Sequence, residues 1–175
     1  RSHNVGLVTR IGNLDRVDRD AATGPRPRRL GSPTPVPGVN WVNMHGPEVD
    51  GLDVRILTRM ELDHRKFIWK NMQKLRSTSG YEKSYLVETA PQLGVRITRV
   101  LSGLNRVRLA DLREGTQFSD VIGVGGASNA NHGPWQIPYG ALLPREVDNV
   151  LAAGRCIDTE MQMADLVRLI PNCFV

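Results

Sequence analysis

The longest regular pattern in the sequence is a run of apolar side chains between Thr58 and Gly80. Its members recur at steps of three and four residues, which places them on one face of an α-helix. They are Met60, His64, Phe67, Ile68, Met72 and Leu75. Thr58 and Glu61 have the spacing of a capping box, which predicts that the helix begins near Thr58. The sequence therefore predicts this helix, with His64 on its apolar face. There His64 is either a packed side chain, which is favoured, or a ligand.

Alternating and β-branched segments predict strands on both sides of the helix. They lie at residues 5–14, 39–44, 95–101 and 119–124, with a strand-like piece at 136–143. Residues 84–94 form a short apolar piece that ends at a turn. Residues 46–51 have the composition of a turn, and residues 109–114 that of one short helical turn. Residues 161–170 have helical spacing that ends at Pro171. This mixture predicts an α+β or α/β fold.

A proline-rich segment interrupts the first half of the chain. Residues 21–38 hold five prolines and three glycines. Proline has no amide hydrogen to donate to a strand ladder, so this segment is predicted to be a loop or extended linker.

The composition excludes several classes of protein. Of the 175 residues 40% are apolar and 5% aromatic, which predicts an aliphatic core. The net charge of +5 allows an acidic partner, but the densest cationic cluster, Arg26, Arg28 and Arg29, lies among prolines. Nucleic acid binding is therefore not favoured. No apolar run approaches the roughly 20 residues of a membrane span.

The cysteine count indicates the compartment. Cys156 and Cys173 form neither a disulfide framework nor a zinc pattern, and we predict no metal site. A reducing intracellular compartment, the cytoplasm or an organelle matrix, is favoured.

The stretch NVLAAGRCIDTE (149–160) carries the first candidate site. Its apolar run, 150–153, predicts a buried strand that ends at Gly154-Arg155. Glycine lets a ligand approach the backbone, and arginine supplies a forked donor, so this turn either contacts a cofactor or is an ordinary strand-to-loop turn.

Two residues after the turn allow two interpretations each. Asp158 either hydrogen-bonds a ribityl or ribose hydroxyl or caps the helix that starts near Met161. Cys156 either touches the cofactor or is a buried, inert thiol.

His132 and two arginines are the remaining candidates. His132 lies in a loop rich in Gly and Asn, where it is either a general acid or base or a solvated side chain. Arg96 and Arg99 are predicted to point to opposite faces of a strand, one of them beside an anion and the other solvated. The sequence shows no nucleophile elbow and no P-loop.

Three ordered stretches resemble the FAD-dependent oxidoreductases whose FAD-binding fold carries an inserted substrate lobe. They are LTRMELDHRKFIWKNMQKLR leading to YLVETAPQLGVRITRV, then FSDVIGVGG followed by His132, and then IPYGALLPREVDNVLAAGRCI followed by Arg168 and PNC. The resemblance implies a substrate-binding lobe at 1–148, with a mixed sheet, flanking helices and the proline-rich loop 21–38. It also implies that 149–175 is an incomplete return segment of the FAD-binding domain, α/β when completed.

The resemblance also implies roles for individual residues. Gly154, Arg155 and Cys156 match the flavin-proximal turn, with Asp158 and Arg168 as further contacts to FAD. Arg96, Arg99 and His132 match positions on the substrate side. The sequence departs from the pattern of similar proteins at Gly140-Ala141, at Ala130 and at Asp158-Thr159-Glu160-Met161, where polar groups expected near the reacting centre are replaced.

The family usually carries a G-x-G-x-x-G turn that this sequence lacks. A complementary chain or segment with the dinucleotide-binding fold is therefore the expected partner, beside a small-molecule substrate. Two functions remain open at this point. One is an enzyme that transfers a hydride to FAD, and the other is a structural subunit derived from such a flavoprotein. Either one predicts that the chain is not a free monomer, because sheet edges and an apolar face would be uncovered.

Overall fold

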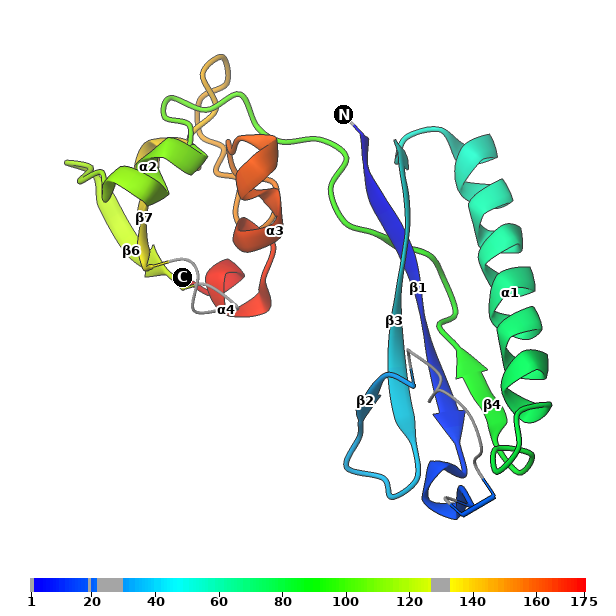
Figure 1. Ribbon diagram of the computed structural model, residues 1–175. Helices are drawn as coiled ribbons and strands as arrows, with labels where there is room; N and C mark the ends of the chain where they lie inside the picture. The colour runs from blue at the N-terminus through cyan, green and yellow to red at the C-terminus, as the bar shows by residue number, and fades with distance from the viewer. Residues whose placement is uncertain (1, 19, 22–29, 127–132) are drawn as a thin grey trace. The chain divides into compact units, whose positions relative to one another are not determined.

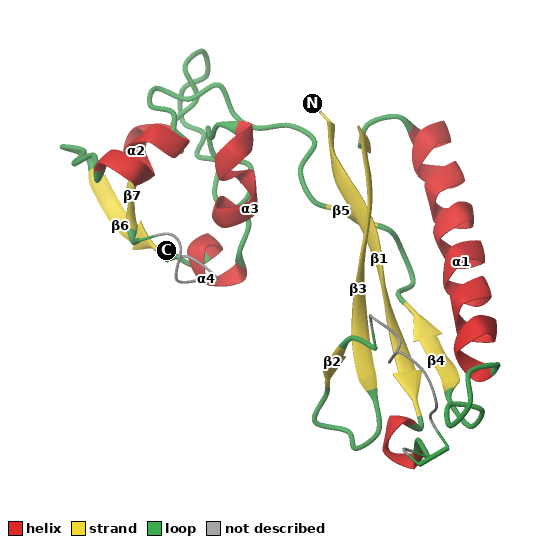
Figure 2. Ribbon diagram, viewed as in Figure 1, coloured by secondary structure: helices red, strands yellow, loops and turns green. Residues whose placement is uncertain are grey.

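The computed structural model describes residues 2–18, 20–21, 30–126 and 133–175, which form two compact units, Arg1–Thr98 and Arg99–Val175 (Figure 1). Helices and strands occur in both units, and the sheets are antiparallel, which confirms the α+β class (Figure 2). The predicted boundary between residues 148 and 149 lies inside the second unit. The assignment of residues 149–175 to a return segment stays a prediction.

A five-stranded antiparallel sheet forms the first unit. Its strands are β1 (Ser2–Gly12), β2 (Ser32–Pro33), β3 (Asn40–Asp50), β4 (Tyr85–Thr89) and β5 (Gly94–Val95), with a 3₁₀ turn η1 (Leu14–Arg16) after β1. The order is β2-β3-β1-β4, and β5 also pairs with β1. The predicted first strand is thus confirmed, and β2 lies within the proline-rich segment.

One long helix, α1 (Val54–Arg76), covers one face of this sheet (Figure 1). It begins four residues before the predicted start. Asp53 is the N-cap, and its Oδ1 accepts hydrogen bonds from the N–H groups of Arg55 at 2.9 Å and Ile56 at 3.2 Å. The predicted capping box is wrong because Asp53 already satisfies these free amides, and the Thr58 hydroxyl donates to the Val54 carbonyl inside the helix.

The apolar face of α1 packs on β1. His64, Ile68, Met72 and Leu75 are the buried helix residues, as predicted for all four. Ile68 packs with Val5 and Leu7, and Met72 and Leu75 pack with Ile11. Phe67 was predicted on this face but is 58% exposed, since it is rotated by about 100° from Ile68 around the helix axis.

Two predicted boundaries in this unit are wrong. The turn predicted at residues 46–51 continues β3 as far as Asp50. A bulge accommodates the irregular pairing there, because Gly46 and Pro47 of β3 together oppose Val5 of β1. The strand predicted at 95–101 ends at Val95. Beyond the Val5–Val95 pair, the Asn4 carbonyl accepts a hydrogen bond from the Arg96 guanidinium, and the chain leaves the sheet.

The second unit combines a short hairpin with small helical elements. They are α2 (Leu109–Glu114), β6 (Val121–Gly125), β7 (Trp135–Pro138), η2 (Tyr139–Ala141), η3 (Met161–Met163), α3 (Ala164–Val167) and α4 (Ile170–Cys173). Its core includes Val107, Trp135, Ile137, Met163 and Val167. The predictions of α2 and β6 are confirmed. The strand expected at 136–143 ends at Pro138, where a 3₁₀ turn begins.

The strand predicted at residues 150–153 does not form. Val150 and Leu151 are 49% and 55% exposed, and the Ala152 N–H donates to the carbonyl of Leu142 in a loop. A strand requires a neighbour along its whole length, and among the described residues no strand pairs with this segment. Pro171 also differs from its prediction, because it lies in the first turn of α4.

Candidate functional site

The sheet face opposite α1 carries a group of aromatic and hydrogen-bonding side chains. Val42 and Met44 of β3 pack on the α1 side. Successive side chains of a strand alternate between faces, so Trp41, Asn43 and His45 lie on the opposite face. Trp41 is 39% exposed there.

Neighbouring strands extend this face. Val8 of β1 is 39% exposed and pairs with Asn43, and Arg10 pairs with Trp41. Arg10 also forms an ion pair of 3.2 Å with Glu88 of β4. The ring of Tyr85 lies against Gly12, where an added Cβ would be 2.6 Å from a ring carbon. The open face therefore offers apolar, aromatic and charged groups side by side.

His45 and Asn43 are the polar pair at the centre of this face. The Asn43 Nδ2 and the His45 Nε2 are 3.1 Å apart, within hydrogen-bonding distance. When the Asn43 amide donates to Nε2 of a neutral His45 ring, the ring hydrogen is on Nδ1, which does not take part in this bond. Sequence reasoning missed both residues. The sequence feature that could have identified them is the alternation of Trp41, Asn43 and His45 with apolar residues along one strand.

The two predicted arginines have different environments. Arg96 is half-buried, and its Nη1 donates to the carbonyl of Asn4 at 2.9 Å and to the Asn4 Oδ1 at 3.0 Å. It therefore fixes the start of β1. Arg99 is exposed and is the first residue of the second unit. The two do not occupy opposite faces of one strand, because the strand ends before them.

A tight turn at Gly154 is the second candidate site. Gly154 has a φ of 78°, a conformation that favours glycine, and the Ile157 N–H donates back to the Gly154 carbonyl at 3.3 Å. Arg155 and Cys156 are exposed on this turn. The interpretation of Cys156 as a buried thiol is therefore wrong.

Asp158 holds the turn in place. It is 3% exposed, and its two carboxylate oxygens accept hydrogen bonds from the Gly103 N–H at 2.8 Å and the Arg106 Nε at 2.7 Å. The Asp158 backbone N–H also donates to the carbonyl of Ala141. The helix-cap interpretation is wrong, because Glu160 occupies the N-cap position of η3. Asp158 serves instead to join three loops behind the turn.

The C-terminal elements lie beside this turn. A Cβ on Gly154 would be 3.7 Å from the Cys173 Sγ of α4. The predicted Arg168 ends α3 and pairs with Asp165 at 2.7 Å. Asn172 bonds both backbone groups of Gly126, each at 2.9 Å, and also the Leu166 carbonyl. Asn172 was not predicted, and it anchors Gly126, the residue directly after β6.

His132 itself lies outside the described residues, so its predicted role stays a prediction. The roles predicted for the other site residues also stay predictions, although their positions are now known.

The chain belongs to the family of FAD-dependent oxidoreductases, whose family model matches residues 13–175. No curated protein and no solved structure matches the chain. The match supports a redox function based on FAD. Among the described residues, no helix is long and apolar enough to cross a membrane.

The turn fits one end of such a cofactor. Gly154 places half-buried backbone beside the exposed Arg155 side chain, and the neighbouring Val150 and Leu151 provide exposed apolar contacts. These groups suit a flat, polar-edged ring system such as the flavin. The carboxylate of Asp158 is occupied by its own chain, so it suits support of the turn better than a direct contact.

Proposed function

We propose that this chain supplies the substrate-binding lobe and the flavin-proximal turn of an FAD-dependent oxidoreductase that accepts a hydride from a small molecule. The observation that carries the proposal is the sheet face with Trp41, Asn43 and His45, to which α1 does not contribute. Small-molecule sites are lined mostly by apolar and aromatic side chains with a few oriented polar groups, and this face offers both kinds of residue.

The residues of the chain have distinct parts in this proposal. The side chains of Trp41 and Tyr85 supply apolar walls, and the His45–Asn43 pair binds a polar group of the substrate. His132 is the proposed acid or base, and Arg96 and Arg99 are proposed to attract an anionic or carbonyl group. FAD, when bound, would supply the hydride acceptor.

The turn would hold the cofactor from the second unit. Gly154, Arg155 and Cys156 are the proposed contacts, positioned by the bonds of Asp158 to Gly103 and Arg106. Arg168 forms an ion pair with Asp165. Its proposed contact with FAD therefore requires that the guanidinium bind FAD in addition to Asp165 or in place of it. A complementary chain or segment is proposed to supply the dinucleotide-binding half.

The second candidate is a structural subunit that retains the flavoprotein lobe without its chemistry. It is favoured by Asp158 and Arg168, two predicted cofactor contacts whose charges are already paired within the chain. Such a subunit would keep the fold and bind its partner without flavin.

An absorbance spectrum of the native assembly between about 300 and 550 nm distinguishes the two functions. Bands near about 370 and 450 nm that stay with this chain during purification and bleach with a substrate or reductant support the enzyme. An intact, folded assembly without these bands rules out the enzyme and leaves the structural subunit.

A further inference from the structure

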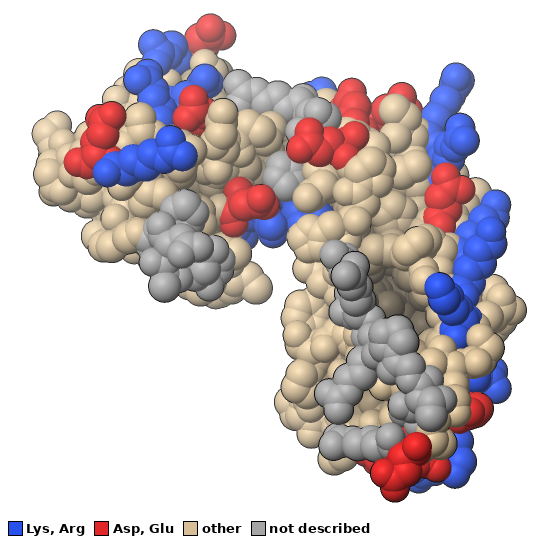
Figure 3. All heavy atoms as spheres, in the orientation of Figure 1, with Lys and Arg blue, Asp and Glu red and all other residues tan. Residues whose placement is uncertain are grey.

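The positive charge of the chain is concentrated on α1. This helix carries seven Lys and Arg residues and two acidic residues, an excess of five that equals the net charge of the whole chain. Figure 3 shows basic side chains along the α1 edge of the first unit. Glu61 pairs with Arg65 and Asp63 with Arg59. Within the described part of the chain, the other five cations of α1 form no ion pair: Arg55, Lys66, Lys70, Lys74 and Arg76.

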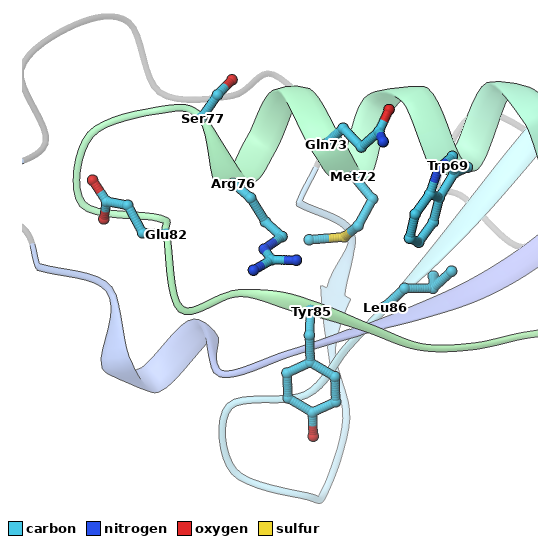
Figure 4. A pocket seen from close by; sticks show the side chains of 8 residues that line it. All are labelled: Trp69, Met72, Gln73, Arg76, Ser77, Glu82, Tyr85 and Leu86. Atoms are coloured by element: carbon cyan, nitrogen blue, oxygen red, sulfur yellow. The ribbon is translucent and has the colours of Figure 1, made fainter.

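One of these cations borders a groove between the end of α1 and β4. The lining of this α1–β4 groove includes Trp69, Met72, Gln73, Arg76, Glu82 and Leu86. Figure 4 shows the Arg76 guanidinium in the space between the helix and the strand, with Trp69 and Leu86 at one end and Glu82 at the other. The groove thus combines an aromatic wall with a cation.

The groove is apolar at its base and open above. Met72 is 4% exposed, whereas Trp69 is 54% exposed although it is the largest side chain there. Leu62, seven residues before Trp69 and on the same side of α1, is also 54% exposed. Exposed Trp and Arg side chains beside an apolar hollow are the residues that dominate binding energy at protein interfaces.

We propose that the α1–β4 groove binds an acidic segment of a partner protein, which inserts one apolar side chain between Trp69 and Leu86 and places a carboxylate on Arg76. Charge complementarity selects the acidic partner, because Arg76 lines the groove and the half of α1 that borders it also carries the unpaired Lys66, Lys70 and Lys74. Glu82 is the acidic residue of the lining. This surface lies on the α1 side of the sheet, opposite the face of Trp41, Asn43 and His45 that is proposed for the substrate. Tyr85 borders both surfaces, with its ring directed away from α1 (Figure 4).

The same surface suits a lipid membrane or a nucleic acid less well. A membrane-binding helix presents its apolar face to the lipid, but the apolar face of α1 is already packed on β1. Single-stranded nucleic acid stacks successive bases on several aromatic rings, whereas Trp69 is the ring at the groove and Tyr85 points away from α1 (Figure 4).

The test uses the intact protein and a fluorescein-labelled peptide of about twelve residues, rich in Glu and Asp with one central Phe. Fluorescence anisotropy measures its dissociation constant. We expect Trp69→Ala to weaken binding at least about tenfold and Arg76→Gln about fivefold. A peptide with Ser in place of Phe should bind about tenfold less tightly.

The helix itself offers matched controls. Phe67→Ala removes an aromatic ring that is 58% exposed on the other side of α1, and Arg55→Gln removes an unpaired cation at its other end. Both should leave the dissociation constant within about twofold of the wild-type value. Circular dichroism checks that all variants are folded.

Three results would overturn the proposal. One is no binding of the Phe-containing peptide up to about 1 mM. Another is equal weakening by Arg55→Gln and Arg76→Gln, which indicates an unspecific charge effect. The third is binding of phosphatidylserine vesicles or of an oligothymidylate, but not of the peptide, with loss on Trp69→Ala. None of these outcomes depends on flavin or on catalysis. The proposed oxidoreductase function can therefore fail while the proposed binding at the α1–β4 groove holds.

Discussion

Two aspartate–arginine pairs in the second unit differ in burial and not in length, which allows a sharp stability prediction. The Asp158–Arg106 and Asp165–Arg168 pairs both have an N···O distance of 2.7 Å. The Asp158 side chain is 4% exposed and that of Asp165 is 63% exposed. Asp158→Asn should therefore destabilise the unit strongly, and Asp165→Asn hardly at all.

The magnitude follows from the bonds that change. The carboxylate of Asp158 accepts one bond from the Gly103 N–H and one from Arg106, and a charge-assisted hydrogen bond contributes about 1.5–3 kcal/mol. The asparagine oxygen can keep one of these bonds, but its NH₂ group then faces the other donor. Arg106 is 40% exposed, so water replaces part of its loss. We expect a decrease of about 2–3 kcal/mol in the free energy of unfolding, against about 0.5 kcal/mol or less for Asp165→Asn.

The assay is urea unfolding followed by tryptophan fluorescence. Trp135 lies in the second unit and Trp41 and Trp69 lie in the first, so a Trp41→Phe, Trp69→Phe background makes Trp135 the reporter. The midpoint of Asp158→Asn should fall by more than about 1 M urea. A loss below about 0.5 kcal/mol, or a loss equal to that of Asp165→Asn, would refute the reasoning that burial decides the strength of this pair.

Three further predictions concern the candidate site. Gly154→Ala should destabilise the second unit by about 1–2 kcal/mol in the same assay, because φ is 78° there, whereas Gly126→Ala should not, since a Cβ at Gly126 meets no neighbouring atom. Asn172→Ala should cost about 2–3 kcal/mol and speed hydrogen exchange at the Gly126 amide, since three hydrogen bonds are lost; unchanged exchange there would contradict the role given to Asn172. If the substrate meets the open sheet face, His45→Gln should lower kcat/KM at least about tenfold with an unchanged flavin spectrum.

Sequence reasoning succeeded where neighbours along the chain decide the structure. The apolar spacing of His64, Ile68 and Met72 predicted the buried face of α1, and the alternation in 5–14 predicted β1. Phe67 was predicted on the buried face of the helix but is exposed. The apolar spacing gives the mean direction of that face, but not how far the buried region extends around the helix. The start of α1 was also missed, since an N-cap at Asp53 competed with the capping box further along.

The candidate site depended on contacts between residues far apart in sequence. Asp158 was predicted either to contact the cofactor or to cap a helix three residues away. Its carboxylate bonds instead to Gly103 and Arg106, more than fifty residues before it. Arg96 was predicted to lie in a strand, yet its guanidinium bonds to Asn4 at the other end of the unit's sequence.

The sequence by itself determined the helix α1, the main strands and the resemblance to FAD-dependent oxidoreductases. These depend on local periodicity, composition and ordered motifs, which can be read without coordinates. Tertiary structure decided which face of the sheet stays open and which carboxylates form ion pairs within the chain. It also decided that residues 150–153 form no strand. The physical reason is that burial, hydrogen-bond partners and strand pairing are properties of two segments at once, and the sequence presents them one at a time.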